Sequence, residues 1–364
     1  MKKATSQDVA RLAGVSQSTV SMILNKKDNV SFSQETIESV LAAAKQLHYE
    51  NANSRGKIAQ NGSKTIAVFC PTLGNPYYTM LLQTIGNEAR KSGYSILICN
   101  TQRNSSSEEQ YVSMFLNGIA CGVIYTYFPQ YPELFQKIAY KLPAVVMGDK
   151  DETINADAVE LNSIKSGIII ADHLLSLGHE KIAYLSTPIR GRQLARHRRL
   201  EGIRQEFEKH GIQNGVILKM QEEPSTQKNT SLNTEYSAGY DLTRELIEEG
   251  DQGITAFVGL NDMVALGIMD ALIDMKYKIP LDYSVVGCDN NMISGLRRVS
   301  LTTVEHYITK KGEDAFHLLL TKMENSDSPQ KDVTPKKIMR LEYEPRLIIR
   351  DTTGPNRKKK KAGK

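Results

Sequence analysis

The chain has 364 residues, 40% of them hydrophobic and 24% charged, which is enough for two or three compact units and too apolar for a disordered polypeptide. The formal net charge of +5 is uneven: residues 1–60 hold eight Lys or Arg against five Asp or Glu, and the last eight residues, RKKKKAGK, hold six positive charges and no acid. No segment reaches the ~18 continuous apolar residues of a membrane-spanning helix, and the start MKKATSQDVARLAG lacks the apolar stretch of a secretion signal. We therefore expect a cytoplasmic protein without a membrane partner.

The basic ends suggest that they meet a polyanion, although RKKKK can also be read as a solvated tail that aids solubility. The four cysteines are scattered and show no C-x-x-C spacing, and three of them lie in or beside apolar runs. They are expected to be buried thiols of a reduced compartment rather than a disulfide or metal framework. No cofactor is expected.

The first sixty residues predict three short helices. Thr5 and Asp8 form a capping-box pattern before QDVARLA, and Gly14 then allows a tight turn. Ser16 can cap a second helix over QSTVSMILN, and Ser33 can cap a third over QETIESVLAAAKQL. The apolar residues of the third segment recur at helical spacing, which supports this interpretation.

The second of these helices has two different faces. Val20 and Ile23 are expected to face inward, toward Val15 and Leu12. The other face carries small polar groups and a methionine: Gln17, Ser18, Ser21, Met22 and Asn25. A helix-turn-helix needs such a face, because short side chains let the helix enter a major groove where Gln pairs with adenine and hydroxyls bond phosphates. The alternative is a small helical cap with a polar exterior.

From Ile66 onward, short apolar runs alternate with segments of helical periodicity. The first series is IAVFC, YYTMLLQTIGNEARKSG, YSILICN, EEQYVSMFLNGI, CGVIYTY, LFQKIAYKL and PAVVMGD. A second series is SGIIIADHLLSLG, KIAYLST, RRLEGIRQEFEKHG, AGYDLTRELIEEG, ITAFVGL, DMVALGIMDALIDM and YSVVGCD. Strands that alternate with helices form a parallel sheet covered on both faces. The sequence therefore predicts an α/β core of two doubly wound parallel-sheet subdomains.

Open parallel sheets bind ligands beyond the carboxyl ends of their strands, so two facing halves would form a cleft. Candidate lining residues directly follow predicted strands: Asn75 to Tyr78, Asp149, Asn162, Asn261, Asp262 and Asp289. Carboxylates and amides suit a hydroxyl-rich ligand, and a tyrosine ring offers an apolar face. Each carboxylate could instead cap a helix or form a loop ion pair.

The segments DVARLAGVSQSTVSMILN and VSFSQETIESVLAAAKQLHY resemble the DNA-binding headpiece of the lactose/galactose repressor family. The resemblance implies that Gln17, Ser18 and Met22 approach base edges. The other residues expected to contact DNA, mainly its backbone, are Thr5, Ser16, Thr19, Ser21 and Asn25. Many family members carry Arg where this chain has Met22, so a guanine contact is lost while contact with a thymine methyl remains possible.

The family continues with Pro-Asn and a short hinge helix whose Leu wedges into the minor groove, whereas this chain reads Asn51-Ala52. Ile58 falls at the wedge position when the segment is counted without gaps. Gly56 and the polar QNGSK make the helix marginal alone, so it is expected to order only with DNA. Ile58 as an ordinary hinge-packing residue is the alternative.

The resemblance extends through LGHEKIAYLST, RRLEGI, GLNDMVALGIMDAL, IPLDYSVVGCDN, LTTVEH and EPRLIIRDTT. It implies a two-lobed core like that of periplasmic sugar-binding proteins, in which Arg199 and Asp262 grip the effector and Tyr77, Tyr78 and Asp149 line the site. The basic stretch RGRQLARHRR would suit an anionic effector or a phosphoprotein, or it is a solvated loop.

Phosphate-loop, nucleophile-elbow and H-E-x-x-H motifs are absent, so catalysis is not expected. The sequence predicts a helix-turn-helix domain over 1–50, a hinge over 51–63, a two-lobed effector and dimerisation domain over 64–353, and a basic tail over 354–364. We expect a homodimeric bacterial repressor, associated with the nucleoid, that binds a palindromic double-stranded operator and responds to a sugar, a sugar phosphate or a related metabolite. A solute-binding receptor for sugar transport is the alternative, but it would need export and has no use for a basic helical headpiece.

Overall fold

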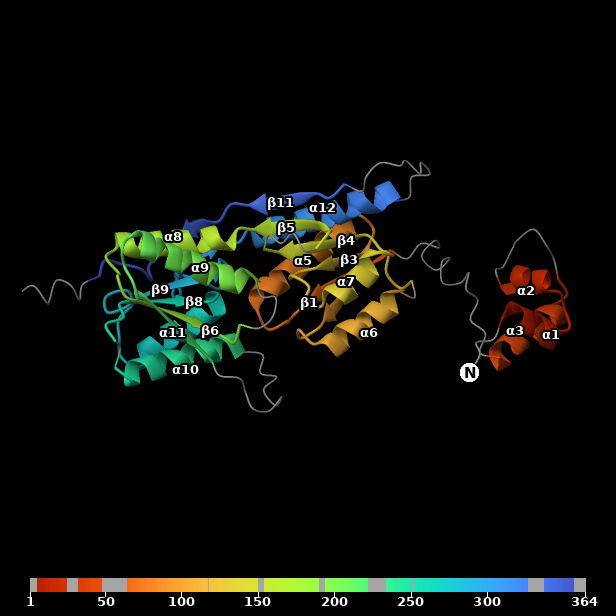
Figure 1. Ribbon diagram of the computed structural model, residues 1–364, viewed down its shortest axis with the longest axis horizontal. Coiled ribbons are helices and arrows are strands. Elements are labelled where there is room, and N and C mark those ends of the chain that lie inside the picture. The colour runs from red at the N-terminus through yellow and green to blue at the C-terminus, as the bar shows by residue number, and fades with distance from the viewer. Residues whose placement is uncertain are drawn as a thin grey trace, which may run out of the picture. The chain divides into compact units, whose positions relative to one another are not determined.

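The computed structural model describes residues 5–24, 32–47, 64–116, 118–149, 154–189, 194–221, 234–250, 252–326 and 337–356. Two compact units are present, of which the first holds the three amino-terminal helices and the second begins at Thr65. The helices of the first unit are α1 Ser6–Ala13, α2 Gln17–Leu24 and α3 Gln34–Gln46 (Figure 1). Val9, Val20 and Val40 are fully buried at their centre. Leu12 was expected in this core, but it is exposed and stands outside the cluster.

The ends of these helices carry the capping residues that the sequence predicts. Thr5 forms a capping box with Asp8: its hydroxyl accepts from the Asp8 backbone N–H, and its own N–H donates to the Asp8 carboxylate at 2.9 Å. Gly14 ends α1 with φ +66°, a left-handed conformation that costs glycine little. The Ser16 hydroxyl accepts from the Thr19 N–H at 3.1 Å and so caps α2. The predicted helix-turn-helix geometry is confirmed at these positions.

The second unit contains two lobes, each built on a six-stranded sheet of described residues (Figure 1). The sheet of lobe 1 has the order β11-β5-β4-β3-β1-β2, and all of its strands are parallel. Its strands are β1 Thr65–Cys70, β2 Ser95–Asn100, β3 Gly122–Tyr125, β4 Ala144–Gly148, β5 Asp157–Leu161 and β11 Arg340–Tyr343. The helices around it are α5 Pro76–Lys91, α6 Ser105–Leu116, α7 Pro132–Ala139 and α12 Ile308–Ser326.

Lobe 2 repeats this plan with the strand order β12-β10-β9-β8-β6-β7, in which β12 alone is antiparallel to its neighbour. Its strands are β6 Ile182–Ser186, β7 Val216–Met220, β8 Ala256–Gly259, β9 Ser284–Asp289, β10 Thr302–Glu305 and β12 Arg346–Ile348. Its helices are α8 Ser163–Ser176, α9 Leu194–Lys209, α10 Thr234–Glu248 and α11 Asp262–Asp274. The predicted pair of doubly wound subdomains is confirmed.

The chain passes between the lobes three times. It leaves lobe 1 after β5 to enter α8, returns after β10 into α12, which packs on α5 and the lobe 1 sheet, and crosses again from β11 to β12. Each lobe is therefore assembled from segments far apart in the sequence, and three chain connections join the two lobes.

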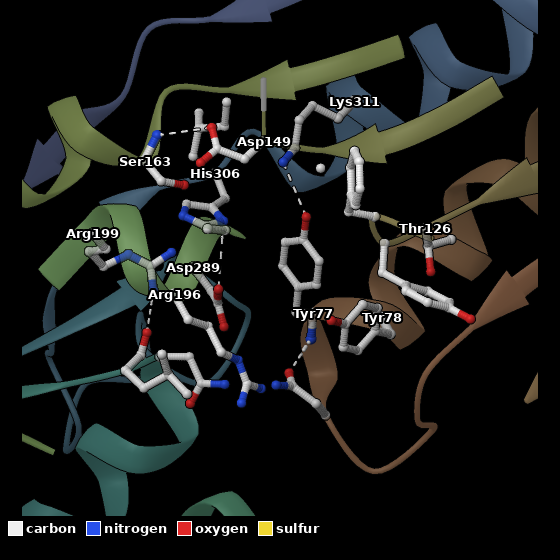
Figure 2. Close-up of a pocket in the computed structure, with 18 of the residues that line it drawn as sticks. Tyr77, Tyr78, Thr126, Asp149, Ser163, Arg196, Arg199, Asp289, His306 and Lys311 are labelled. Carbon is white, nitrogen blue, oxygen red and sulfur yellow. Dashed lines mark hydrogen bonds and ion pairs between the residues drawn. The ribbon is translucent and has the colours of Figure 1, made fainter. Parts of the chain in front are cut away.

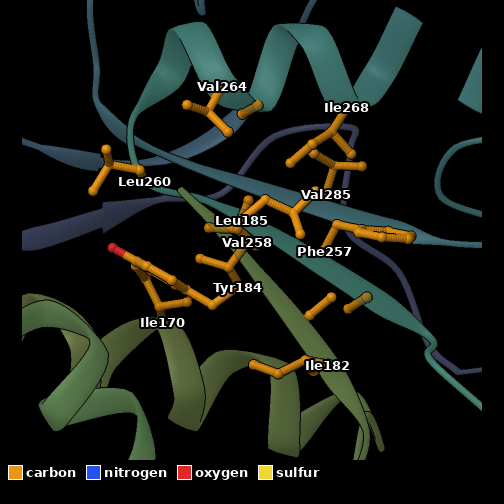
Figure 3. Close-up of a cluster of buried hydrophobic side chains, with 14 of the residues drawn as sticks. Ile170, Ile182, Tyr184, Leu185, Phe257, Val258, Leu260, Val264, Ile268 and Val285 are labelled. Atoms are coloured by element: carbon orange, nitrogen blue, oxygen red, sulfur yellow. The ribbon is translucent and has the colours of Figure 1, made fainter. Parts of the chain in front are cut away.

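Apolar side chains fill lobe 2 on both faces of its sheet. Figure 3 shows Tyr184, Val258 and Val285 on the strands, with Ile170 of α8 on one side and Ile268 of α11 on the other. On one face of this sheet, α8 and α9 pack closely against each other. A Cβ atom added to Gly167 of α8 would lie 2.1 Å from the backbone oxygen of Arg199 on α9, so only glycine allows this approach. No described helix is long and apolar enough to span a bilayer.

Candidate functional site

A cavity of about 130 Å³ lies between the two lobes, beyond the carboxyl ends of their strands. Lobe 1 contributes the start of α5, the ends of β3 and β4, and Lys311 of α12, and lobe 2 contributes α9, the start of α10 and the end of β9 (Figure 2). Lining residues used below are Asn75, Tyr77, Tyr78, Arg103, Asp149, Ser163, Arg196, Arg199, Glu235, Asn261, Asp289, His306 and Lys311.

Seven of the residues that the sequence suggested for this site line the cavity: Asn75, Tyr77, Tyr78, Asp149, Arg199, Asn261 and Asp289. Asn162 and Asp262 do not line it. The Asn162 side chain caps α8 by accepting from the Lys165 N–H at 3.0 Å. Asp262 is completely buried, and its carboxylate accepts from the Thr303 hydroxyl at 2.5 Å and from the Asn291 N–H at 2.9 Å. Both side chains are thus held by helix capping and internal hydrogen bonds.

Arg199 and Asp289 form the lobe 2 wall. Arg199 is 4% exposed and donates from Nη1 to the carbonyl oxygen of Leu260, which fixes the guanidinium. Asp289 is 6% exposed, and Oδ1 lies 3.6 Å from Nδ1 of His306, whereas Oδ2 has no hydrogen-bond partner among the described residues. Burial is the main cause that raises the pKa of Asp289 well above its usual value, and burial lowers the pKa of His306 well below its own.

The backbone at the end of β9 is unusual. Asp289 has φ +155° and Asn290 has φ +51°, conformations that side chains other than glycine seldom adopt. The surrounding fold must hold them, since each such residue costs on the order of 1–3 kcal/mol. The turn places the Asp289 carboxylate at the cavity wall.

Lys311 and Tyr77 face each other from α12 and α5. Lys311 is only 2% exposed; its Nζ donates to the Tyr77 hydroxyl at 3.1 Å and lies 5.5 Å from the centre of that ring (Figure 2). The Tyr77 ring packs edge-on against Tyr78, with centroids 5.0 Å apart. Burial, partly offset by Asp289, lowers the pKa of Lys311 to about 8, so its ammonium is mostly charged at neutral pH.

A polar bridge joins the lobes beside the cavity. Nδ2 of Asn75, at the start of α5, donates to Oε2 of Glu235 at 2.6 Å, and Nη2 of Arg196 donates to Oε1 of the same carboxylate at 3.1 Å. Arg196 also donates to the Thr187 hydroxyl at 2.9 Å. A second ion pair lies close by: Arg198 Nη1 is 3.5 Å from Oδ2 of Asp149. These two arginines are therefore neutralised by carboxylates.

Sequence reasoning did not assign Arg103, Glu235, His306 or Lys311 to this site, and it considered Arg196 only as part of the basic stretch RGRQLARHRR. Lys311 left a signal, because it falls at the helical spacing of Ile308 and Ala315 and so on the apolar face of α12. A lysine at such a position is either paired or functional.

The polar face of α2 is the second candidate site. Gln17, Ser18 and Ser21 are exposed, and Met22 is half-buried. The Gln17 amide donates to the Ser6 hydroxyl at 2.8 Å, and the Ser16 hydroxyl lies 2.7 Å from that of Ser18 and 2.8 Å from that of Thr19. Asn25, the hinge with Ile58, and tail residues 357–364 lie outside the described residues.

Two family models match the chain: bacterial regulatory proteins of the lacI family over residues 5–51, and a periplasmic binding protein-like domain over residues 171–353. The HTH-type transcriptional repressor PurR of Mannheimia succiniciproducens is 28% identical over 353 residues, which cover 95% of this chain and 98% of that protein. The ribose operon repressor of Escherichia coli is 29% identical over 321 residues, which cover 87% of this chain and 92% of that protein.

Solved structures show the same architecture. A LacI family transcriptional regulator from Enterococcus faecium with bound ribose is 25% identical, with a TM-score of 0.67, covering 80% of this chain and 99% of that one. The lac repressor dimer bound to operator and the anti-inducer ONPF has a TM-score of 0.65 at 23% identity, covering 97% of this chain and 100% of that one. The second likeness concerns the fold alone.

Proposed function

The chain belongs to the lacI family of bacterial regulatory proteins, and on this basis we propose that it is a transcriptional repressor whose affinity for operator DNA is controlled by a small molecule bound between the lobes. The observation that carries the proposal is the combination, in one chain, of a capped helix-turn-helix with an exposed polar second helix and a two-lobed core with a polar cavity. A sugar receptor for transport has no use for the first of these.

For DNA, we assign base reading to Gln17, Ser18 and Met22, with Thr5 and the hydroxyls of α2 near the phosphates. The Gln17 amide is held by Ser6, which orients it before DNA is met. An amide can bond bidentately to adenine, and a methionine offers only apolar contact, so this chain is expected to prefer A or T where other family members select guanine. Ile58 is assigned to the minor groove as a wedge.

A dimer is proposed, because one headpiece contacts only a few base pairs and two-fold symmetry matches a palindromic operator. An apolar groove on lobe 1 is suited to such an interface: it runs over α5 and β2 and is lined by Leu73, Leu82, Tyr94, Ile96 and Ile98. Exposed apolar surface of this kind commonly marks a protein interface.

For the effector, we propose a hydroxylated metabolite such as a sugar or a sugar phosphate. The ribose bound to the Enterococcus faecium regulator supports this class. The unpartnered oxygen of Asp289 can accept from a ligand hydroxyl, and Tyr77 and Tyr78 offer ring faces. The lobes would rotate about the three chain connections, changing the separation of the paired hinges, with a coupling of typically ~1–3 kcal/mol.

The test is operator selection with the full-length protein, from genomic fragments, in the cytoplasmic salt range. The protein is expected to bind its best fragment at least about a thousandfold more tightly than random duplex. Gln17→Ala is expected to reduce this ratio while leaving the affinity for random duplex nearly unchanged. Equal affinity for all fragments, with and without metabolites, would exclude the proposed function.

A further inference from the structure

We propose that the effector is an anion: a small hydroxylated molecule whose phosphate or carboxylate group binds Arg103 and Lys311 of lobe 1 together with Arg199 of lobe 2. This inference rests on the proposed function, because it names the class of molecule that the same cavity takes. Its basis is the balance of charge at the cavity wall.

The cavity carries more positive charge than its own carboxylates neutralise. Arg196 pairs with Glu235 and Arg198 pairs with Asp149, so these four groups cancel. Among the described residues, neither Arg103 nor Lys311 has a carboxylate within ion-pair distance. Arg103 donates to the Tyr78 hydroxyl at 3.2 Å and lies 5.3 Å above the Tyr127 ring, and Lys311 donates only to the Tyr77 hydroxyl.

Asp289 is the remaining carboxylate of the wall, which also holds the cations Arg103, Arg199 and Lys311, and its charge interacts with those of Arg199 and Lys311. Two of these cations are almost completely buried, at 4% exposure for Arg199 and 2% for Lys311. Burying a cation costs several kcal/mol unless a counter-charge or sufficient hydrogen bonds compensate it. Asp289 compensates both cations in part, and an anion in the cavity would supply further counter-charge.

The helix ends strengthen the same preference. The first residues of α5, α8 and α11 line the cavity through Asn75, Ser163 and Asn261. The amino-terminal end of a helix bears a partial positive charge that favours an anion. Asparagine side chains already cap the first N–H groups of these helices, so the preference comes from the charge and not from unpaired donors. These three helices are long, at 16, 14 and 13 residues.

A bare inorganic anion does not complete the site. Oδ2 of Asp289 is buried without a hydrogen-bond partner among the described residues, and a ligand hydroxyl can bond it whether the carboxyl is ionised or protonated, whereas a second anionic group would repel the ionised form. The Asn261 oxygen caps α11 at the Val264 N–H, which leaves its NH₂ group available to a ligand. A molecule with both an anionic group and hydroxyls satisfies the cations and Asp289 together, as a sugar phosphate or a sugar acid does.

The positions of the cations also explain why a bound anion would favour closure of the cleft between the lobes. Arg103 and Lys311 stand on lobe 1 and Arg199 on lobe 2, so the empty cleft holds cations of both lobes near one another. An anion that bonds both sides replaces this repulsion with attraction and therefore binds the closed arrangement more tightly than the open one. Such differential affinity is what a ligand needs in order to switch a protein.

The experiment is isothermal titration of the full-length protein, with thermal unfolding in parallel, using matched probes. These are glucose, glucose 6-phosphate and gluconate, then ribose and ribose 5-phosphate, and inorganic phosphate alone. At least one anionic probe is expected to bind about tenfold or more tightly than its neutral parent, with an affinity that falls between 50 and 500 mM salt. The phosphate and gluconate probes distinguish an ester phosphate from a carboxylate.

The variants Arg103→Gln and Lys311→Met are expected to lose about tenfold or more of the affinity for the anionic probe. Neither is expected to lower the melting temperature of the unliganded protein, because each removes a cation that has no carboxylate partner among the described residues. Arg204→Gln, an exposed substitution on α9, is the matched control and is expected to bind like the parent protein. Equal binding of a sugar and its phosphate, unchanged affinity in both variants, or no binding of any anionic probe would overturn the inference.

The operator-selection experiment distinguishes a failure of the anion inference from a failure of the proposed repressor function. If a neutral sugar binds as tightly as its anionic counterpart and changes operator affinity, the anion inference is wrong and the repressor function stands. If the protein discriminates no DNA fragment, the proposed function fails whichever probe the cavity binds.

Discussion

The buried ammonium of Lys311 makes effector binding sensitive to pH. Its pKa is lowered to about 8, so the side chain loses its charge as the pH rises through that value. The titratable and charged groups around it are Tyr77 of α5, Arg199 of α9, Cys288 and Asp289 of β9, Glu305 at the end of β10, and His306 directly after it. Burial raises the pKa of Tyr77 and that of Cys288, so both stay neutral in this range.

We therefore predict that affinity for an anionic effector decreases between pH 7 and pH 9. The phosphate of a sugar phosphate is already dianionic above pH 7, so the change belongs to the protein. Titrations at several pH values, with the parent protein and Lys311→Met, are the measurement. The variant should bind weakly and without this pH dependence, whereas a parallel decrease in both proteins would assign the effect to another group.

Glu108 is a second buried group, placed on α6 below the cavity wall. It is 0% exposed, and its carboxyl oxygens accept from the hydroxyls of Tyr125 and Tyr127 at 3.1 and 3.2 Å. Burial raises its pKa from 4.5 to about 7. Between these values the folded protein keeps a proton that the unfolded chain releases, so stability falls as the pH rises from about 4.5 to 7 and is not regained above it.

Glu108→Gln should abolish this decrease in stability with rising pH, because glutamine does not ionise. At pH 8 the free energy of unfolding is predicted to exceed that of the parent by on the order of 2–3 kcal/mol, with little difference at pH 4.5. Thermal unfolding at both pH values checks it, with the exposed neighbour Glu109→Gln as control. The same gain at both pH values would show that ionisation is not its cause.

Residues of the cavity could be predicted from the sequence where they follow directly after a strand. Tyr77, Tyr78, Asp149 and Asp289 were found because they follow strands. Asp262 follows a strand too, yet it reaches Thr303 across the fold, which no spacing in the sequence reveals. Arg103, Glu235 and Lys311 were missed because a charged side chain near a helix start usually faces solvent.

At the scale of elements, the contact between α8 and α9 positions the effector arginines. Gly167 and Gly202 let the two backbones touch: a Cβ atom on Gly202 would lie 2.1 Å from the oxygen of Ile164. Arg196 and Arg199 stand on α9, and the oxygen of Arg199 itself lies against Gly167. Any side chain at Gly167 must push α9 away.

Gly167→Ala is accordingly predicted to lower the free energy of unfolding by about 1–3 kcal/mol and to weaken effector binding. DNA binding without effector should be retained, because the first unit is not altered. Denaturant unfolding, effector titration and operator binding measure these three effects. Asp172→Ala, on the exposed side of α8, is the control, and an equally small effect of both substitutions would contradict the tight contact.

Most elements were predictable because alternating apolar strands and amphipathic helices have distinct periods, as β1 and α5 show. The strands β5, β7, β10, β11 and β12 and the helix α12 were not among the predicted elements. β11 and β12 show one reason. RLEY and RLI are only partly buried edge strands, without a long apolar run, and their partners β5 and β10 are distant in sequence. Pairing between distant segments, rather than local pattern, creates them.

At the scale of the whole molecule, the proposed dimer depends on one edge of lobe 1. β2 and β11 form the two edges of the same sheet, and Ile98 on β2 and Leu341 on β11 are both 41% exposed. Only Ile98 lies in the apolar groove. The two residues therefore form a matched pair for a substitution experiment.

Ile98→Asp is predicted to dissociate the dimer, since a carboxylate buried at an apolar interface is costly. Leu341→Asp should leave it intact. Sedimentation velocity gives the oligomeric state, and operator titration should show a loss of affinity for Ile98→Asp alone. A dimer that survives Ile98→Asp, or that both substitutions disrupt equally, would place the interface elsewhere.

Because the chain crosses between the lobes three times, both lobes receive their last strand only after most of the chain described here has been synthesised. A ribosome delivers α1 to α3 first, and these helices have a core of their own. Lobe 1 lacks its edge strand β11, and lobe 2 lacks β12, until residues 340–348 have been synthesised. A chain that stops before residue 340 would therefore lack an edge strand in both lobes, so the cavity between them, and with it control by the effector, is expected to form only after these residues have been synthesised.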